Sequence, residues 1–237
     1  MNAVILPIIV TGILSTVVHS LANAIPSLNF LTTNNGITLA GLGLMALFLG
    51  LRWYGRADAL GLRNGRPFMA GVGFAFLGWV GLLIARFLAV GIVEGEAATN
   101  LGITYLFLLI LEAFCVQLWT YGLLFRTVAE WRNPISAVLY SGILYGFTAY
   151  YLYTITFDSR LSLLYYVVLG IFYGMIRLRT GSFLGIVFIQ ALQTLTVWYL
   201  LPPTEPISLS WLYGLSCTIY LIITWRLLPK YVSDFRV

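Results

Sequence analysis

The segment YGLLFRT, residues 121–127, ends an apolar run of helix length that begins near residue 100. It keeps aliphatic residues, a glycine and an arginine, and it carries no carboxylate or imidazole. Two segments downstream, LYGFTAY at 144–150 and RTGSFLGIVFIQALQT at 179–194, have the same character. All three therefore combine an ordered helical framework with a lack of side chains that could accept a proton near neutral pH.

The chain around these segments is too apolar for a soluble fold. Of its 237 residues, 60% are hydrophobic and 9% are charged, and the mean hydropathy is +0.94. About eight apolar runs each approach the ~20 residues that cross a bilayer. They cover residues 3–24, 32–51, 68–92, 100–125, 134–153, 161–177, 182–201 and 208–227. We therefore predict an all-α, polytopic integral membrane protein with a single transmembrane domain over residues 1–237.

Charge placement predicts the topology. All basic residues except Arg86 and Arg160 fall on one side of the predicted helices. They are Arg52, Arg56, Arg63, Arg66, Arg126, Arg132, Arg177, Arg179, Arg226, Lys230 and Arg236. The opposite breaks hold Glu94, Glu96, Asp158 and Glu205. The positive-inside rule places both termini in the cytoplasm, and the net charge of +5 reflects this bias and not a nucleic-acid partner.

Two ionisable residues fall inside predicted membrane helices, where charge is costly. Arg86 lies in the outer half of the third run and Glu112 near the middle of the fourth. Because a short turn joins these runs as antiparallel neighbours, we expect a buried Arg86–Glu112 ion pair. The pair either fixes the helix register or takes part in chemistry, and the first role is the more common.

His19 is the single histidine of the chain. A lone histidine in a membrane helix is usually a hydrogen-bonded packing residue. The alternative is an axial ligand to a haem or chlorophyll metal, which one histidine without a further motif supports only weakly. A two-histidine zinc site is excluded by the count. We therefore predict no metal site and no cofactor, and leave contact with lipid or pigment open.

The segments quoted above resemble the intramembrane metalloprotease family abbreviated CPBP, which includes CAAX-processing proteases and bacteriocin-protection proteins. That family typically carries Glu-Glu-x-x-x-Arg, then Phe-x-x-x-His, then His-x-x-x-Asn or Asp. Its third motif often follows a stretch such as GIFYGMIRLRTGSFLG at 170–185. The resemblance covers about residues 55–200 and implies a CAAX-protease-like helical core.

The first motif keeps its arginine and loses its acids. Tyr121 and Gly122 stand where the resemblance places the paired glutamates, and Arg126 matches the arginine. A tyrosine is a poor base because its unperturbed pKa is about 10, and a glycine supplies no side chain. Glu112 is no simple substitute, because it lies nine and ten residues upstream, about 14–15 Å along a helix axis.

The second and third motifs lose both histidines. Tyr145 stands for the phenylalanine and Ala149 for the first histidine, while Gln190 and Thr194 occupy the second histidine and Asn/Asp positions. The resemblance implies an enzyme in which a glutamate and histidines activate water, with a metal implicated in many members. A general base must accept a proton within hydrogen-bond reach of that water, and a zinc site needs about three N, O or S ligands. The residues present supply neither.

We therefore predict a proteolytically inactive member of this family. Its expected cavity, near the cytoplasmic side, is lined by Tyr121, Arg126, Tyr145, Gln190 and Thr194, and would hold a transmembrane segment, a lipid or a prenyl-like tail. The protein would then bind, assemble or support other membrane proteins in a bacterial plasma membrane or a thylakoid membrane.

Several alternatives stay open at this point. The polar residues could serve only to hydrogen-bond neighbouring helices. Proteolysis could persist with Glu112 as the base of an intramembrane endopeptidase. A small transporter is a further alternative, although no inverted repeat is visible. A permanent subunit would differ from an assembly factor in co-purifying with its partner in equal amounts.

Overall fold

The structure is a computed structural model that describes residues 2–25, 27, 32, 35–90, 103–153, 161–196, 206–231 and 234–236. Within these ranges the chain forms helices and turns and no strand. The all-α prediction is therefore confirmed. The predicted outer-loop residues Glu94, Glu96, Asp158, Arg160 and Glu205 lie outside the described residues.

Each predicted apolar run corresponds to a described helix. The elements are α1 (Asn2–Ala24), α2 (Asn35–Tyr54), the 3-10 helix η2 (Ala57–Leu60), α3 (Arg66–Val90), α4 (Ile103–Gln117), the π-helix η3 (Leu118–Leu124), α5 (Phe125–Trp131), α6 (Pro134–Tyr153), α7 (Ser162–Thr180), α8 (Leu184–Gln193) and α9 (Pro206–Leu227). Six described spans are long and apolar enough to cross a membrane: α1, α2, α3, the continuous α4–η3–α5 helix, α6 and α7. This supports a polytopic membrane protein, with α8 a shorter apolar helix.

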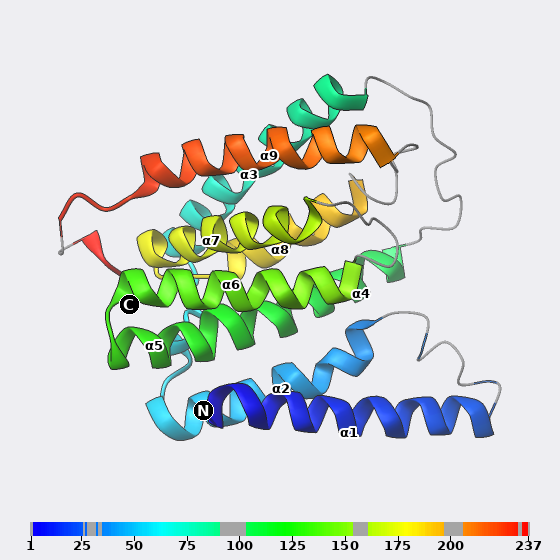
Figure 1. Ribbon diagram of the computed structural model, residues 1–237. Helices are drawn as coiled ribbons and strands as arrows, with labels where there is room; N and C mark the ends of the chain where they lie inside the picture. The colour runs from blue at the N-terminus through cyan, green and yellow to red at the C-terminus, as the bar shows by residue number, and fades with distance from the viewer. Residues whose placement is uncertain are drawn as a thin grey trace.

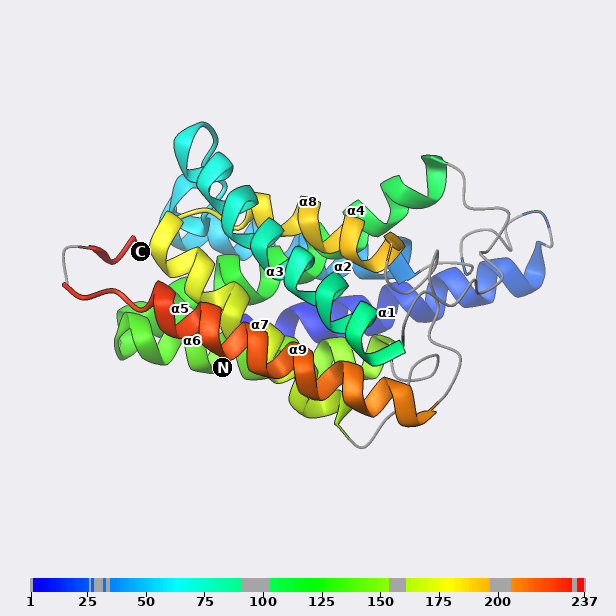
Figure 2. The same cartoon turned by 90° about the horizontal axis from the view of Figure 1, so that it is seen from above.

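The helices form a bundle of stacked layers (Figure 1). α1 and α2 pack together along one edge, and α2 contacts α4 and η3. α6 and α7 make the most extensive helix pair near the middle of the bundle. Beyond them α3 and α9 lie side by side, as Figure 2 shows from above. Because α8 contacts both α3 and α4, it separates these two helices, although they are consecutive in the chain.

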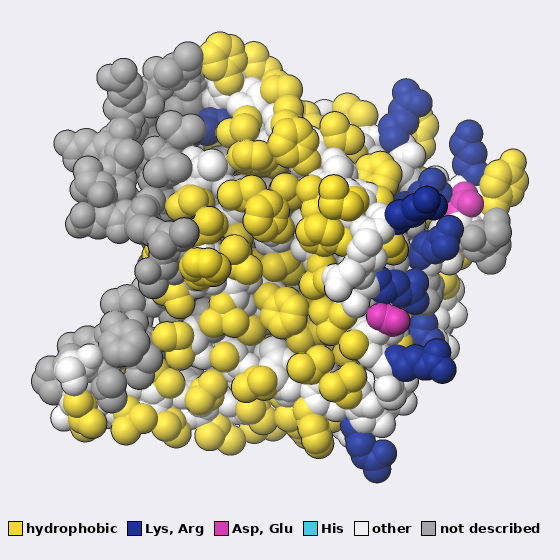
Figure 3. All heavy atoms as spheres, turned by 180° about the vertical axis from the view of Figure 1, so that it is seen from behind, with side chains coloured by type: hydrophobic (Ala, Val, Ile, Leu, Met, Phe, Trp, Pro, Cys, Tyr) yellow, Lys and Arg dark blue, Asp and Glu magenta, His cyan; other side chains and the backbone are white. Residues whose placement is uncertain are grey.

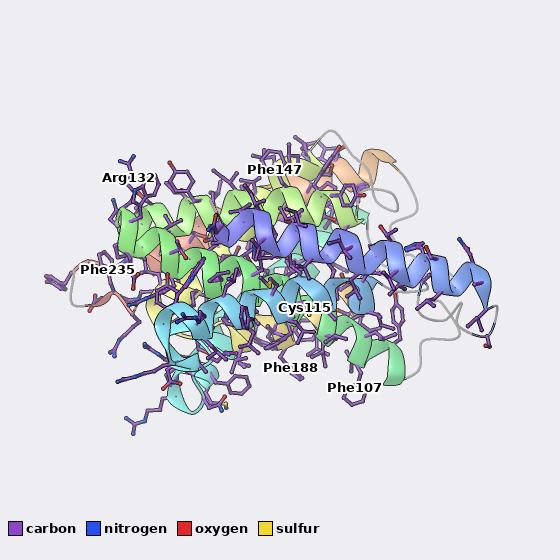
Figure 4. All side chains as sticks on the ribbon, turned by 90° about the horizontal axis from the view of Figure 1, so that it is seen from below. Phe107, Cys115, Arg132, Phe147, Phe188 and Phe235 are labelled. Carbon is purple, nitrogen blue, oxygen red and sulfur yellow. The ribbon has the colours of Figure 1, made fainter. Side chains whose placement is uncertain are left out.

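The character of the bundle surface changes from its middle to one of its ends. A broad band of hydrophobic side chains covers the middle, and Lys and Arg gather at one end (Figure 3). Phe107, Phe147 and Phe188 are exposed in this band and point away from the bundle, whereas Cys115 is buried inside it (Figure 4). Both termini lie at the same end (Figure 1). This distribution is what a bilayer-spanning protein requires, since its lipid-facing surface must be apolar.

Local sequence sets the helix ends at the basic end of the bundle. Asn133 caps α6: its side-chain oxygen accepts from the backbone N–H of Ser136 at 2.7 Å, and Pro134 occupies the first helical position. α7 ends where Gly181 adopts a left-handed conformation with φ of 78° and its N–H bonds the carbonyl of Arg177 at 2.9 Å. The start of α6 and the end of α7 are thereby fixed at the basic end of the bundle.

Candidate functional site

The first motif segment lies in an unusual piece of helix. Residues Leu118–Leu124 form a seven-residue π-helix between α4 and α5, and Tyr121 and Gly122 lie within it. The backbone N–H of Phe125 bonds the carbonyl of Thr120, five residues earlier. π-helical turns are rare in proteins overall. Those that do occur lie frequently at functional sites, where the wider turn changes the direction of the side chains that follow. The backbone at Tyr121 and Gly122, the positions that the resemblance aligns with the paired glutamates, is therefore not regular α-helix.

Tyr121 points into the bundle from this π-helix and is fully buried. Its hydroxyl donates to the carbonyl of Gly170 in α7 at 2.6 Å. Its ring lies 5.8 Å from the ring of Tyr145, which comes from α6. The residue at the first glutamate position thus ties η3 to α6 and α7.

The second motif segment adds a further aromatic side chain to the same place. The ring of Tyr145 contacts that of Tyr173 edge-on, with the centroids 5.6 Å apart. Ala149, one turn further along α6, is also buried. The second motif segment thus contributes a tyrosine ring packed at the distances usual for aromatic pairs in protein cores, and a buried alanine.

The third motif segment contributes amide groups. Gln190 in α8 accepts a hydrogen bond from the side-chain amide of Gln117 in α4. The hydroxyl of Thr194 donates to the carbonyl of Gln190 at 2.9 Å, and residues 194–196 form a second short π-helical turn. Gln193 donates to the hydroxyl of Tyr165 at 3.3 Å. The polar groups that this segment contributes are therefore buried amides and a hydroxyl, bonded to other amides, a phenol and the backbone.

Arg126 lies apart from the other residues predicted to line the cavity. Its guanidinium pairs with Glu130 at 2.8 Å and lies over the ring of Tyr54, 5.7 Å from the centroid. Within the described residues, no hydrogen bond or ion pair joins it to Tyr121, Tyr145, Gln190 or Thr194. The helical turns after the π-helix direct Arg126 towards α2. The structure brings Tyr121 together with Tyr145, and Gln190 together with Thr194, and leaves the arginine outside both pairs.

The predicted partners Arg86 and Glu112 are both buried. The helices that carry them, α3 and α4, both contact α8. The pairing of the two side chains stays a prediction. One terminal nitrogen of Arg86, Nη1, is buried without a hydrogen-bond partner among the described residues.

Sequence analysis missed two residues that organise this region. Gln117 is fully buried one turn before Tyr121, and its position as an amide in an apolar helix was a signal that could have identified it. Arg177 was taken for a loop charge, and it is fully buried in the last turn of α7. It donates to the carbonyl of Tyr121 at 3.2 Å and to that of Arg236 at 3.1 Å. Arg177 therefore connects the π-helix to the C-terminal tail.

The donor set does not fit the catalytic metal that the family resemblance implies. The motif positions offer a phenol that is already hydrogen-bonded, a glycine, an alanine and an amide. Among the described residues, no three His, Cys, Asp or Glu side chains lie close enough together to hold a metal ion. Since a catalytic zinc needs about three N, O or S ligands and an open position, no step through a metal can be derived from these residues.

The Gln117–Gln190 pair yields a first prediction. Gln190→Leu should lower the free energy of unfolding by about 1–2 kcal/mol, because the Gln117 amide is left buried without its partner. Gln117→Leu together with Gln190→Leu should be less destabilising than the sum of the single variants, because both amides are removed. Thermal unfolding in detergent, followed by intrinsic fluorescence, measures all three. A double variant with strictly additive losses would contradict a direct interaction.

Comparison with known families gives a match that spans the three motif segments. Residues 98–196 match the model of the family described as Type II CAAX prenyl endopeptidase Rce1-like. The matched region contains all three motif segments and confirms the resemblance to CAAX-protease-like membrane proteins of the CPBP family. No curated protein and no solved structure shows a significant match to the chain.

Proposed function

We propose, on the premise that residues 98–196 form a CAAX-protease-type membrane core, that this chain is a proteolytically inactive family member. It serves as a binding, assembly or structural subunit for other membrane proteins in a bacterial plasma membrane or thylakoid, with both termini in the cytoplasm. The observation that carries the proposal is what stands at the positions of the family's proton-accepting groups: the packed, buried ring of Tyr121 and the buried amide of Gln190, which pairs with Gln117.

The packing of this cluster supports a structural role for the former catalytic centre. A hydrolase needs a water molecule beside a base and a path for substrate to both. Here the Tyr121 hydroxyl is committed to Gly170, the rings of Tyr145 and Tyr173 pack against each other, and Ala149 at the first histidine position is buried. Close packing of this kind stabilises helix association in a membrane, where packing and buried hydrogen bonds are the main attractive forces.

The retained framework supports an origin in an enzyme and a use as a scaffold. Arg126 and the RTGSFLG segment keep the family pattern although the groups they would assist are gone. Client proteins would then meet the lipid-facing surface of the bundle, since four of the residues predicted to line a cavity are buried. Binding through the outer faces of helices needs no open catalytic cavity.

The competing enzyme hypothesis rests on Glu112, the buried carboxylate in α4. Its test uses purified protein in lipid nanodiscs, a farnesylated peptide ending in a CAAX sequence, and added zinc, with the products measured by mass spectrometry. We expect no peptide cleavage above the level of a Glu112→Gln variant. Cleavage by the natural sequence that Glu112→Gln abolishes would overturn the proposal.

The binding role needs its own measurement. Mild-detergent purification from the native membrane should recover another membrane protein in a fixed ratio, and the same ratio should persist in Glu112→Gln because no chemistry is involved. A control variant, Gly73→Ala, adds one methyl group on α3 with no atom within 4 Å and should also keep the ratio. Recovery of the chain without any reproducible partner would contradict the binding role.

A further inference from the structure

The first helix has a position unlike that of the other long helices. α1 lies at the edge of the bundle and packs on α2 and the π-helix η3 (Figure 1). Its buried residues are Ala3, Pro7, Val18 and Ala22, which form one narrow side. α1 also lies outside residues 98–196, so it is not part of the region matched by the family model. Most of its surface faces outward.

The outward side of α1 carries a row of small and polar residues. Gly12, Thr16, His19 and Asn23 are all exposed, and their spacings of four, three and four residues place them on one face of the helix. No atom lies within 4 Å of the position that a Cβ would take at Gly12. This spacing is the pattern of a helix–helix seam, and a glycine in such a seam lets two backbones approach closely.

His19 lies within the expected hydrocarbon layer. α1 ends at Ala24, and a residue five positions before a helix end lies about 7–8 Å from that end along the axis. A helix of this length exceeds a hydrocarbon thickness of ~30 Å by only a few ångströms. The imidazole is therefore below the membrane surface, and Asn23 is close to the boundary.

The hydrogen bond of His19 determines what its free side can accept. The ring nitrogen Nδ1 lies 2.9 Å from the carbonyl oxygen of Ser15. Since a carbonyl can only accept, Nδ1 carries the proton, and Nε2 of the neutral ring is a bare acceptor. Lipid chains offer no donor, so an acceptor at this depth is costly unless another helix supplies one. The Thr16 hydroxyl does not serve, because it donates to the carbonyl of Gly12 at 2.9 Å.

We propose that this face of α1 docks against α1 of a second copy of the same chain. Both copies insert with the same topology, so a two-fold axis along the membrane normal makes the two helices parallel. In such a pair each seam residue packs among residues one turn above and below it on the facing helix. His19 then lies within reach of Asn23 of the second copy, whose amide supplies the missing donor, and Gly12 permits the close approach.

The seam is thus self-complementary in hydrogen bonding as well as in shape. Each copy provides an acceptor at His19 and a donor one turn further on, at Asn23. The two-fold axis places the acceptor of each copy beside the donor of the other copy. A helix from an unrelated protein would need to match both the donor and its level in the membrane. The dimer does not depend on the proposed scaffold role. If the protein proved to be a monomer, the dimer would be ruled out and the scaffold role would still stand.

Disulfide cross-linking in membranes tests the face directly. Ile5→Cys, Thr16→Cys and Ile9→Cys place thiols along the seam, while Ile13→Cys and Val17→Cys place them on neighbouring exposed parts of the same helix. Cys115 and Cys217 are buried, so the natural sequence provides the background. Mild oxidation in proteoliposomes should give covalent dimers at the three seam positions and several-fold less at the two control positions. Equal yields at all five, or a maximum at the controls, would overturn the proposal.

A second variant tests the part played by the histidine. His19→Ala combined with Thr16→Cys should lower the dimer yield by roughly five- to tenfold, because two interhelical hydrogen bonds are lost, while thermal unfolding of the monomer fold stays unchanged. An unaltered yield of cross-linked dimer would show that His19 is not part of the seam. A visible absorption band of a bound tetrapyrrole that disappears in His19→Ala would show Nε2 ligating a metal instead, and cross-linking to another protein alone would exclude the homodimer.

Discussion

Gly170→Ala is expected to prevent the formation of a stable bundle. α6 and α7 meet at glycines, and a Cβ at position 170 would fall on the backbone of Gly142, within 3.0 Å of its Cα and carbonyl carbon. A flexible side chain could turn aside, but a helical backbone cannot, so the two helices must separate. Overpacking usually costs about 1–3 kcal/mol, and we expect a loss at or above the upper end. The yield of monodisperse protein and its Tm measure the effect.

The reciprocal contact and a matched control make this prediction specific. Gly142→Ala would bring a Cβ 2.7 Å from the backbone nitrogen of Ile171, so it should be similarly damaging. Gly73→Ala is also a glycine-to-alanine change within a long apolar helix, and nothing lies within 4 Å of its Cβ. It should leave Tm unchanged or raise it slightly through helix propensity. Equal Tm values for Gly170→Ala and Gly73→Ala would contradict the close approach of α6 and α7.

The helical architecture could be predicted because the length of each apolar run can be read directly from the sequence. Each apolar run of about membrane thickness became a helix, since the backbone must satisfy its own hydrogen bonds in lipid. The predicted end of the fourth apolar run, at residue 125, was wrong. Charge at Arg126 indicated the membrane boundary, but the helix continues through α5 to Trp131. Only the Asn133–Pro134 cap, which starts α6, marks the change of direction.

The site could be predicted only in part, because neighbours in a chain are not always neighbours in space. Tyr121 and Tyr145 do meet, as the motif alignment implied. The pairing of Arg86 with Glu112 stays a prediction, since a short connection between α3 and α4 does not make them direct neighbours, and both helices contact α8. The partner of Gln190 was unforeseen for a related reason. Gln117 comes from a distant part of the chain, and pairing across helices depends on rotation angles that the sequence does not encode locally.

Arg177→Ala is expected to lower the free energy of unfolding by about 3 kcal/mol. The guanidinium is fully buried, lies 5.2 Å from the centroid of the Phe125 ring, and donates to the carbonyls of Tyr121 and Arg236. Removing it leaves a void beside η3 and takes the donor from the Tyr121 carbonyl. The tail also loses one of its attachments to α7. Thermal unfolding in detergent should show a clear fall in Tm.

Arg179→Ala provides the matched control two residues away. Arg179 also holds the tail, through an ion pair with Asp234 at 3.1 Å, but both side chains are more than one-third exposed. Pairs of this kind contribute about 0–1 kcal/mol, so Tm should change little. Arg177→Met separates the remaining causes, because it fills the space without donating a hydrogen bond. If Arg177→Met and Arg177→Ala are both as mild as Arg179→Ala, the desolvation cost of the buried charge cancels its hydrogen bonds, and Arg177 does not hold the π-helix in place.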